Sequence, residues 1–405
     1  MSLTLSAADT QRIIDVLFLL KSPAPTPLAK PTNVGGLEAK LDPIAADPRF
    51  KNIGFAVVDF TASMTTPKVW LHNGDDAWRV GSTGKIAALL AAAQLRDDVR
   101  NVKALNIISS PADFDELFST IWLQSSNSLI KQIAEAGSSP RISTIFDLTQ
   151  SPPDFLGANV ALDKGKLKTI GENHLSWAGA PDLTFWERLW LTGAQSDNVA
   201  TTSCISDIGV AYMKAVQRGY GLFDEPNGMH FLLAAGYAGV DTSTPVNRTS
   251  GAPKYRGLRN FESHRVKDAY YEKNKKGDLV ASYYSTEPGS AAALTAYMLA
   301  LMGDTLVSKD GCDSIRAVLA DETQFTATSL IYEGVDAIST VTKAHTKLGI
   351  LGALRCEFAY IEAGTVKFAV LATGILPVRV GSTSYKQVKQ GQDLGAAIYN
   401  ALSTP

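Results

Sequence analysis

The chain has 405 residues, of which 45% are hydrophobic and 19% are charged, and its formal net charge is −2. This length is enough for two subdomains with a sizeable core, and the composition is typical of a globular enzyme. The balanced charge gives no basic footprint for nucleic acid, and no apolar run approaches the roughly 18 residues of a membrane span.

The N-terminal part is predicted to hold one helix and two strands. Residues 6–20 have a helical pattern, and the apolar stretch Ile13 to Leu20 within them is too short for a typical signal peptide. A cytoplasmic location is therefore the default expectation. A proline-rich connector over 23–31 is followed by a strand from Ile53 to Phe60 and its hairpin partner from Lys68 to His72.

Ser82 and Lys85 open a run of alanine and leucine that continues to Ala93. This run is apolar on all sides, which predicts a buried helix. Residues three apart share a helix face, so the Lys85 amine can reach the Ser82 hydroxyl. The positive potential of a helix N-terminus favours loss of the serine proton, and covalent catalysis needs such an activated nucleophile.

Two competing interpretations of this segment are weaker. A phosphate-binding loop needs glycine at position 79 and serine or threonine at position 86, where the chain has Arg79 and Ile86. A second serine–lysine pair with the same spacing, Ser128 and Lys131, opens no alanine-rich run. We interpret that second pair as a pattern on a helix surface.

The middle of the chain, from about 100 to 320, has a mainly helical pattern. It contains Ser125-Ser126-Asn127, in which a hydroxyl to relay protons and an amide to hold a substrate carbonyl stand beside a predicted helix. The stretch from Ala238 to Ser285 is rich in Gly, Arg, Lys and Tyr and suggests a lid, an insertion or an interface. The three cysteines are far apart and the five histidines have no ligand spacing, so we expect no disulfide framework, metal or cofactor.

Strand patterns return near the C-terminus, over 344–351, 359–362 and 366–374, and a final helix is predicted over 393–402. The simplest architecture is an α/β (α+β) fold: an antiparallel sheet built from both chain ends, flanked by terminal helices, with an inserted helical subdomain. The predicted divisions are 1–80 for the N-terminal helix and first strands, 81–325 for the mainly helical subdomain with Ser82 and Ser125, and 326–405 for the remaining strands and last helix.

The first of these C-terminal strands contains Lys347, Leu348, Gly349 and Ile350. Its lysine supplies positive charge, and its glycine allows a ligand to approach the backbone closely. With Ser82-x-x-Lys85 and Ser125-x-Asn127 before it, the segment completes three motifs in a fixed order. In these motifs the chain resembles the serine β-lactamase and penicillin-binding-protein superfamily, which implies a β-lactamase/transpeptidase-like fold and a serine hydrolase.

The resemblance also implies a role for each matching residue. Ser82 would attack an acyl carbon, Lys85 would accept its proton, and Ser125 would pass a proton to the leaving group. Asn127 would orient the substrate amide, and Lys347 would attract an anionic substrate group. The remaining substrate-binding positions are Gly349 and Ile350, and the backbone N–H groups of Ser82 and Ile350 would form the oxyanion hole.

Three departures from the family pattern qualify this assignment. Leu348 replaces the Thr or Ser whose hydroxyl helps to bind a carboxylate. Ser196-Asp197-Asn198 has the family's commonest second-motif spelling, but it lies further along the chain than the family usually allows, which favours Ser125. Glu172 lies in only a partial match to the deacylating E-x-x-L-N segment.

These departures predict slow or negligible turnover of β-lactams and an ester or amide substrate, small-molecule or peptide. The alternatives are a true β-lactamase that uses Glu172, a transacylase or D-Ala-type peptidase, and a non-catalytic binding protein of the same fold. The sequence predicts no nucleic-acid partner and leaves the oligomeric state open.

Overall fold

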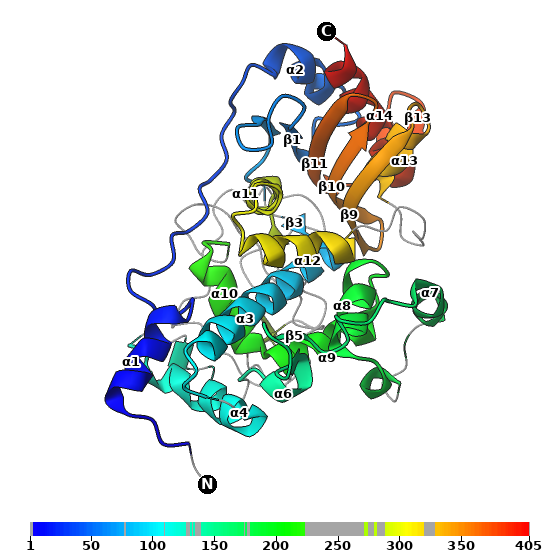
Figure 1. The fold of residues 1–405 in the computed structure, drawn as a ribbon. Coiled ribbons are helices and arrows are strands. Elements are labelled where there is room, and N and C mark those ends of the chain that lie inside the picture. Colours follow the sequence, from blue (N-terminus) through cyan, green and yellow to red (C-terminus); the bar gives the residue numbers. More distant parts are fainter. Residues whose placement is uncertain are drawn as a thin grey trace.

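The structure is a computed structural model, and the helices and strands below are taken from it (Figure 1). Among the residues that it describes, no helix is long and apolar enough to cross a membrane. Asn127, Ser128 and most of the stretch from Ala238 to Ser285 lie outside the described residues. The structure describes residues 3–76, 78–108, 110–126, 130–131, 133, 139–173, 175, 179–222, 271–273, 279–281, 288–319 and 329–404.

A five-stranded antiparallel sheet combines strands from both ends of the chain, in the order β2-β1-β11-β10-β9. Both of its faces are covered, which explains why its central strands are nearly continuous apolar runs. The predicted strands and the predicted fold class are confirmed. The five strands are β1 (Gly54–Asp59), β2 (Lys68–His72), β9 (Val341–Leu351), β10 (Leu354–Ala363) and β11 (Val366–Ile375).

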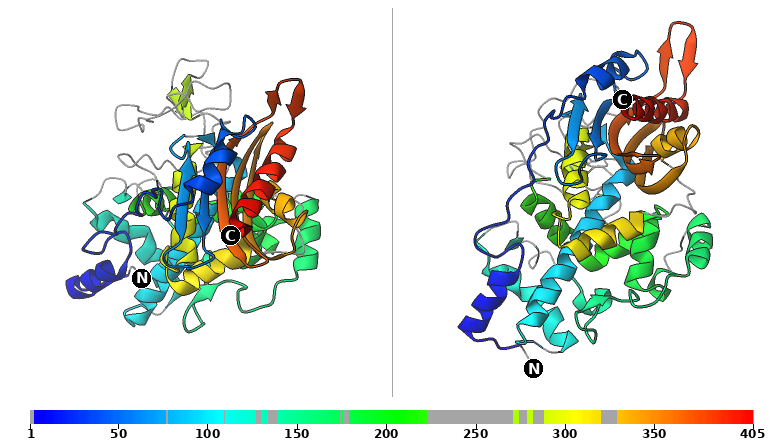
Figure 2. Two further views of the ribbon diagram at one scale, coloured as in Figure 1. Left: turned by 90° about the horizontal axis from the view of Figure 1, so that it is seen from above. Right: turned by 45° about the horizontal axis from the view of Figure 1, so that its top comes forward.

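One face of the sheet packs against helices from the two chain ends, α2 (Glu38–Ala46), α13 (Leu330–Asp336) and α14 (Gln387–Ser403). Phe55 and Val57 of β1 are in this part of the core. The last helix begins at Gln387, before the predicted start at Asp393. The hairpin formed by β12 (Val378–Val380) and β13 (Thr383–Tyr385) projects beyond the sheet (Figure 2).

The other face packs against α11 (Ala291–Met302) and the central helix α3 (Ile86–Ala104), which crosses the middle of the molecule (Figure 1). Ala56 and Val58 of β1 point to this side, as the alternation of side chains along a strand requires. Alanine and leucine residues are buried along most of α3, so the predicted buried helix is confirmed.

The remaining helices surround α3. The hairpin of α8 (Phe185–Gly193) and α9 (Asn198–Ile208) contacts it directly, and this contact brings the 194–197 loop to the sheet. The division into 1–80, 81–325 and 326–405 remains a prediction. The other elements are α1 (Ala7–Val16), α4 (Pro111–Thr120), η2 (Ile121–Gln124), α6 (Ile142–Ile145), α7 (Lys164–Glu172), η3 (Ala180–Asp182), α10 (Val210–Gly219), α12 (Lys309–Leu319), and the short strands β3 (Trp78–Arg79), β4 (Phe146–Asp147), β5 (Asp154–Phe155), β6 (Tyr271–Lys273), β7 (Leu279–Ala281) and β8 (Pro288–Gly289).

Candidate active site

Ser82 and Lys85 lie on one short 3-10 helix, η1 (Gly81–Lys85), which leads directly into α3. Gly81 begins it with φ +54°, a left-handed backbone conformation that glycine adopts without steric cost. Ser82 is half-buried, whereas Lys85 is completely buried. The predicted nucleophile and base are therefore neighbouring residues at the buried start of the central helix.

The Lys347-Leu348-Gly349 segment of β9 packs directly against η1. A Cβ atom on Gly349 would lie only 2.0 Å from the Val80 carbonyl oxygen and 2.6 Å from Thr83 Oγ1, so only glycine permits this contact. Thr83 Oγ1 also donates to the carbonyl oxygen of Lys347 at 3.4 Å. The first and third predicted motifs are thus in backbone contact.

Ile350 lies beside the residue that precedes Ser82. A Cβ atom built on Gly81 would be 3.0 Å from the Ile350 backbone nitrogen. Ile350 is 48% exposed, so its side chain does not pack into the core at this edge of β9. The backbone of Ile350 is therefore near the segment in which the resemblance predicts an oxyanion hole.

The Lys85 amine contacts Ser196 and Asn198. Its Nζ atom donates to the Ser196 carbonyl oxygen, lies 3.3 Å from Ser196 Oγ, and is 2.7 Å from Asn198 Oδ1. We predicted that Ser196 and Asn198 lie away from this site, and that prediction is wrong. Because α8 and α9 form a hairpin against α3, the loop between them reaches Lys85 despite its distance along the chain.

Local capping fixes the loop that carries these residues. Asp197 is the N-cap of α9 and accepts from Ala200 N at 2.7 Å and from Leu175 N at 3.2 Å. Ser196 has φ +56°, which is uncommon for a residue with a side chain and is found preferentially at functional sites. The aspartate before a helical run was the sequence signal that identifies this loop as the start of a helix.

Ser125 follows η2 and is half-buried, whereas Asn127 lies outside the described residues. The participation of Ser125 and Asn127 in the site therefore stays a prediction. The structure supplies a second Ser-x-Asn pair at Lys85, so the two pairs are competing candidates for the same role.

Burial lowers the pKa of both lysines of the site, and like charge adds to this effect at Lys85. Burial, and then the positive charge of Lys347, lower the pKa of Lys85 well below its ordinary value, while Asp197 acts in the opposite direction. Burial alone lowers the pKa of Lys347 to about 7. An amine with a lowered pKa can accept a proton near neutral pH, as a general base must.

Leu348 and Glu172 occupy positions that limit their influence on the site. Leu348 is cross-strand from Glu357, whose carboxylate accepts from Leu330 N at 2.8 Å, so it lies on the sheet face covered by α13. Lys347 points to the opposite face. The carboxylate of Glu172 is 44% exposed at the end of α7 and lies 3.9 Å from Lys168. The side chain at position 348 therefore lies away from Lys347, on the face opposite to the one where a carboxylate-binding hydroxyl was expected.

The β-lactamase enzyme family matches residues 162–402, more than half of the chain, and the protein belongs to this family. The matched range contains Ser196, Asn198 and Lys347, whereas Ser82 and Lys85 precede it. A search of curated protein sequences found no match.

The chain is also similar to several solved structures. PBP-A is 12% identical with a TM-score of 0.45, over 93% of this chain and 100% of that one. A β-lactamase from Sphaerobacter thermophilus is 16% identical with a TM-score of 0.43, over 91% and 97%. A β-lactamase from Chitinophaga pinensis is 13% identical with a TM-score of 0.44, over 91% and 99%. Membership rests on the family match.

Proposed function

We propose that the protein is a serine hydrolase that forms an acyl-enzyme at Ser82 on an ester or amide substrate, a small molecule or a peptide. The observation that carries the proposal is the environment of Lys85: a completely buried amine one helical turn from Ser82, in contact with Ser196 and Asn198. A binding protein has no need for a buried amine with a lowered pKa beside a serine.

In the proposed reaction, neutral Lys85 takes the hydroxyl proton of Ser82 while Ser82 Oγ bonds to the acyl carbon. The backbone N–H groups of Ser82 and Ile350 stabilise the resulting oxyanion. The bond from the acyl carbon to the leaving oxygen or nitrogen then breaks, and the proton passes from Lys85 through Ser196 Oγ to the leaving atom. Water hydrolyses the ester on Ser82, releases the carboxylic acid and restores the hydroxyl.

We also propose specific substrate-binding roles. Asn198 lies exposed at the edge of this site, where its amide can hold a substrate carbonyl while Oδ1 contacts Lys85. Lys347, whose pKa is about 7, provides positive charge for an anionic group while its amine is protonated. The backbone of Gly349 would contact the substrate at the edge of β9. Ser125 and Asn127 retain their proposed roles only if labelling experiments favour them over Ser196 and Asn198.

The proposed preference is for esters or amides over β-lactams. Leu348 lies on the α13 face, so this preference does not rest on the missing hydroxyl at position 348. Glu172 is exposed beside Lys168, which does not support a role in activating the deacylating water. A penicilloyl ester on Ser82 would therefore persist longer than the ester formed from a simple acyl donor.

A serine-directed fluorophosphonate followed by intact-mass measurement tests the proposal. We expect one label per chain, located on the peptide that contains Ser82, and no label on the Ser82→Ala variant. Ser119→Ala, which changes an exposed serine on α4, is the matched control and should label normally. Labelling that persists in Ser82→Ala would overturn the assignment.

Steady-state kinetics on a chromogenic cephalosporin and a p-nitrophenyl ester tests the substrate class. We expect ester turnover and little cephalosporin turnover from the wild type. Because Leu348 lies on the α13 face, Leu348→Thr should change cephalosporin turnover by less than about threefold. Fast cephalosporin turnover by the wild type would contradict the preference, and product analysis with an added amine would distinguish hydrolysis from acyl transfer.

A further inference from the structure

A second pocket lies on the α8–α9 hairpin, away from Lys85. It has a volume of about 620 Å³, within the range of small-molecule sites, and neither Ser82 nor Lys85 lines it. Its α9 residues Ser203 and Asp207 are five and nine positions after Asn198, which corresponds to roughly 8 to 14 Å along the helix. The pocket is therefore separate from the candidate active site.

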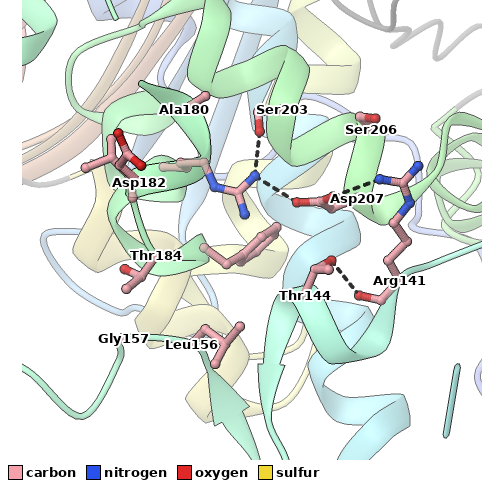
Figure 3. A pocket seen from close by; sticks show the side chains of 13 residues that line it. Arg141, Thr144, Leu156, Gly157, Ala180, Asp182, Thr184, Ser203, Ser206 and Asp207 are labelled. Atoms are coloured by element: carbon pink, nitrogen blue, oxygen red, sulfur yellow. Dashed lines mark hydrogen bonds and ion pairs between the residues drawn. The ribbon is translucent and has the colours of Figure 1, made fainter. Parts of the chain in front are cut away.

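Two arginines meet one carboxylate in this pocket (Figure 3). Arg188 Nη1 lies 2.7 Å from Asp207 Oδ2 and 2.5 Å from Ser203 Oγ, and Arg141 Nη1 lies 3.7 Å from Asp207 Oδ1. The Arg188 side chain is only 8% exposed, whereas Arg141 is 64% exposed. Two positive charges therefore face a single negative charge on this wall.

The Arg188 guanidinium has donors for which the described part of the chain offers no acceptor. Nη1 makes both of its hydrogen bonds, and among the described residues Nε has no hydrogen-bond partner and none is found for Nη2. A buried cation with unused donors is costly unless an acceptor completes it. Arginine presents its donors in a planar fork that suits a carboxylate.

The other residues that line the pocket determine which chemical groups a ligand can carry besides its carboxylate. Leu156 provides apolar surface, and Gly157 and Ala180 leave space beside it. Asp182 lies across the pocket from Arg141 and Asp207, so a second negative charge on a ligand would be repelled there (Figure 3).

We propose that this pocket binds an amphipathic monocarboxylate, with the carboxylate beside the guanidinium groups of Arg188 and Arg141 and the apolar body against Leu156. The pocket and the loop at Ser196 belong to the same α8–α9 hairpin. A ligand bound in the pocket would therefore contact the hairpin that also contacts Lys85. The binding proposal does not depend on the proposed hydrolase activity.

Binding of 3-phenylpropionate to the full chain tests this site, measured by calorimetry and by ligand-observed NMR. We expect saturable binding with a Kd of about 1 mM or tighter. The uncharged 3-phenylpropionamide should bind at least about tenfold more weakly, and phenylsuccinate, with two carboxylates, should also bind more weakly. Equal binding of acid and amide, or no saturable binding, would overturn the proposal.

Two pocket variants and two variants outside the pocket locate the binding. Arg141→Gln should weaken it about threefold to tenfold, and Ser206→Glu, which adds a carboxylate from an exposed lining position of α9, should abolish it. Arg12→Gln, at an exposed arginine of α1, is the matched control and should bind normally. Binding that survives both pocket variants, or that is lost instead in Lys347→Met, would place the acid elsewhere and reject this site.

Discussion

The central helix has buried basic side chains at its start and in its middle, and their surroundings are opposite. Arg96, in the middle of α3, is 3.1 Å from Asp154 and 3.2 Å from Asp310, and Arg100 shares both carboxylates. Lys85, at the start of the helix, contacts the neutral oxygens of Ser196 and Asn198, and burial and then the charge of Lys347 lower its pKa. Charge around Arg96 is balanced, whereas the surroundings of Lys85 disfavour protonation of its amine.

The surroundings of Arg96 stabilise the fold, whereas those of Lys85 prepare an amine for proton transfer. Replacing a buried cation that is paired with carboxylates lowers stability, because the carboxylates are then left without a counter-charge. A buried amine whose surroundings lower its pKa contributes little ion-pair stabilisation, but it can accept a proton more readily near neutral pH. Substitutions at these two places should therefore have opposite effects on stability and on acylation.

The largest expected effect is at Lys85. Lys85→Met should lower the acylation rate by about a thousandfold or more, because general-base catalysis typically contributes a factor of about 10² to 10⁴. Its free energy of unfolding should be unchanged or higher, since the variant no longer buries an ionisable amine. Stopped-flow labelling and urea unfolding measure the two quantities, with Lys103→Met on the same helix as the control. Normal acylation in Lys85→Met would remove this residue from the mechanism.

The next effect decides between the two Ser-x-Asn pairs. Ser196→Ala should slow acylation by about a hundredfold, because it removes the hydroxyl 3.3 Å from the Lys85 amine. Ser125→Ala should change the rate by less than about threefold. Single-turnover kinetics with an ester substrate would measure both. The reverse ranking would restore Ser125 as the relay and reduce Ser196 to a structural contact.

Where carboxylates balance the charge on α3, Arg96→Met should lower the free energy of unfolding rather than the acylation rate. The variant removes a buried cation that touches Asp154 and Asp310, and we expect a loss of about 2 to 3 kcal/mol in the free energy of unfolding. Arg100 still contacts both carboxylates, so the chain should remain folded. Acylation in the folded variant should stay within about twofold of the wild type. A large loss of acylation with intact stability would contradict the comparison.

The smallest effect is the pH dependence of stability that Lys347 contributes. Its pKa is about 7 in the folded chain and about 10.4 when unfolded, so in between the unfolded state binds one more proton. This contribution therefore favours folding increasingly as pH rises, and is lost as pH falls towards 7. Burial raises the pKa of Glu357 to about 8, which has the opposite effect below that value.

Unfolding measurements between pH 8 and 10 separate the contribution of Lys347 from that of Glu357. The difference in unfolding free energy between the wild type and Lys347→Met should change by up to about 1.4 kcal/mol per pH unit in this range. Tyrosine and cysteine titrations are common to both proteins and cancel in the difference. A difference that does not vary with pH would mean that Lys347 keeps its proton in the folded chain.

The sheet was predictable from sequence because its central strands are largely apolar runs between clear turns. Gly54 to Asp59 and Val366 to Ile375 are buried on both faces, and such runs are visible without knowledge of their partners. The last helix begins at Gln387, several residues before the predicted start at Asp393. Helix boundaries are generally less certain than the existence of a helix.

The candidate site was predictable only in part, for a different reason. The link from Ser82 to Lys85 is local, so helix geometry alone predicts it. The link from Lys85 to Ser196 depends on how α8 and α9 fold back on α3, and distance along the chain pointed to Ser125 instead. Burial of Lys347, which lowers its pKa, likewise depends on packing of β9 against the helices.

The glycine contact between β9 and η1 has a consequence for how this chain can change in length. Thr83 and Lys347 are 264 positions apart, yet their segments touch backbone to backbone through Gly349. The entropy of closing such a loop grows only slowly with its length. Segments inserted or deleted between these anchor points should therefore leave their spacing unchanged, so the middle of the chain can diversify while the geometry around Ser82 is inherited intact.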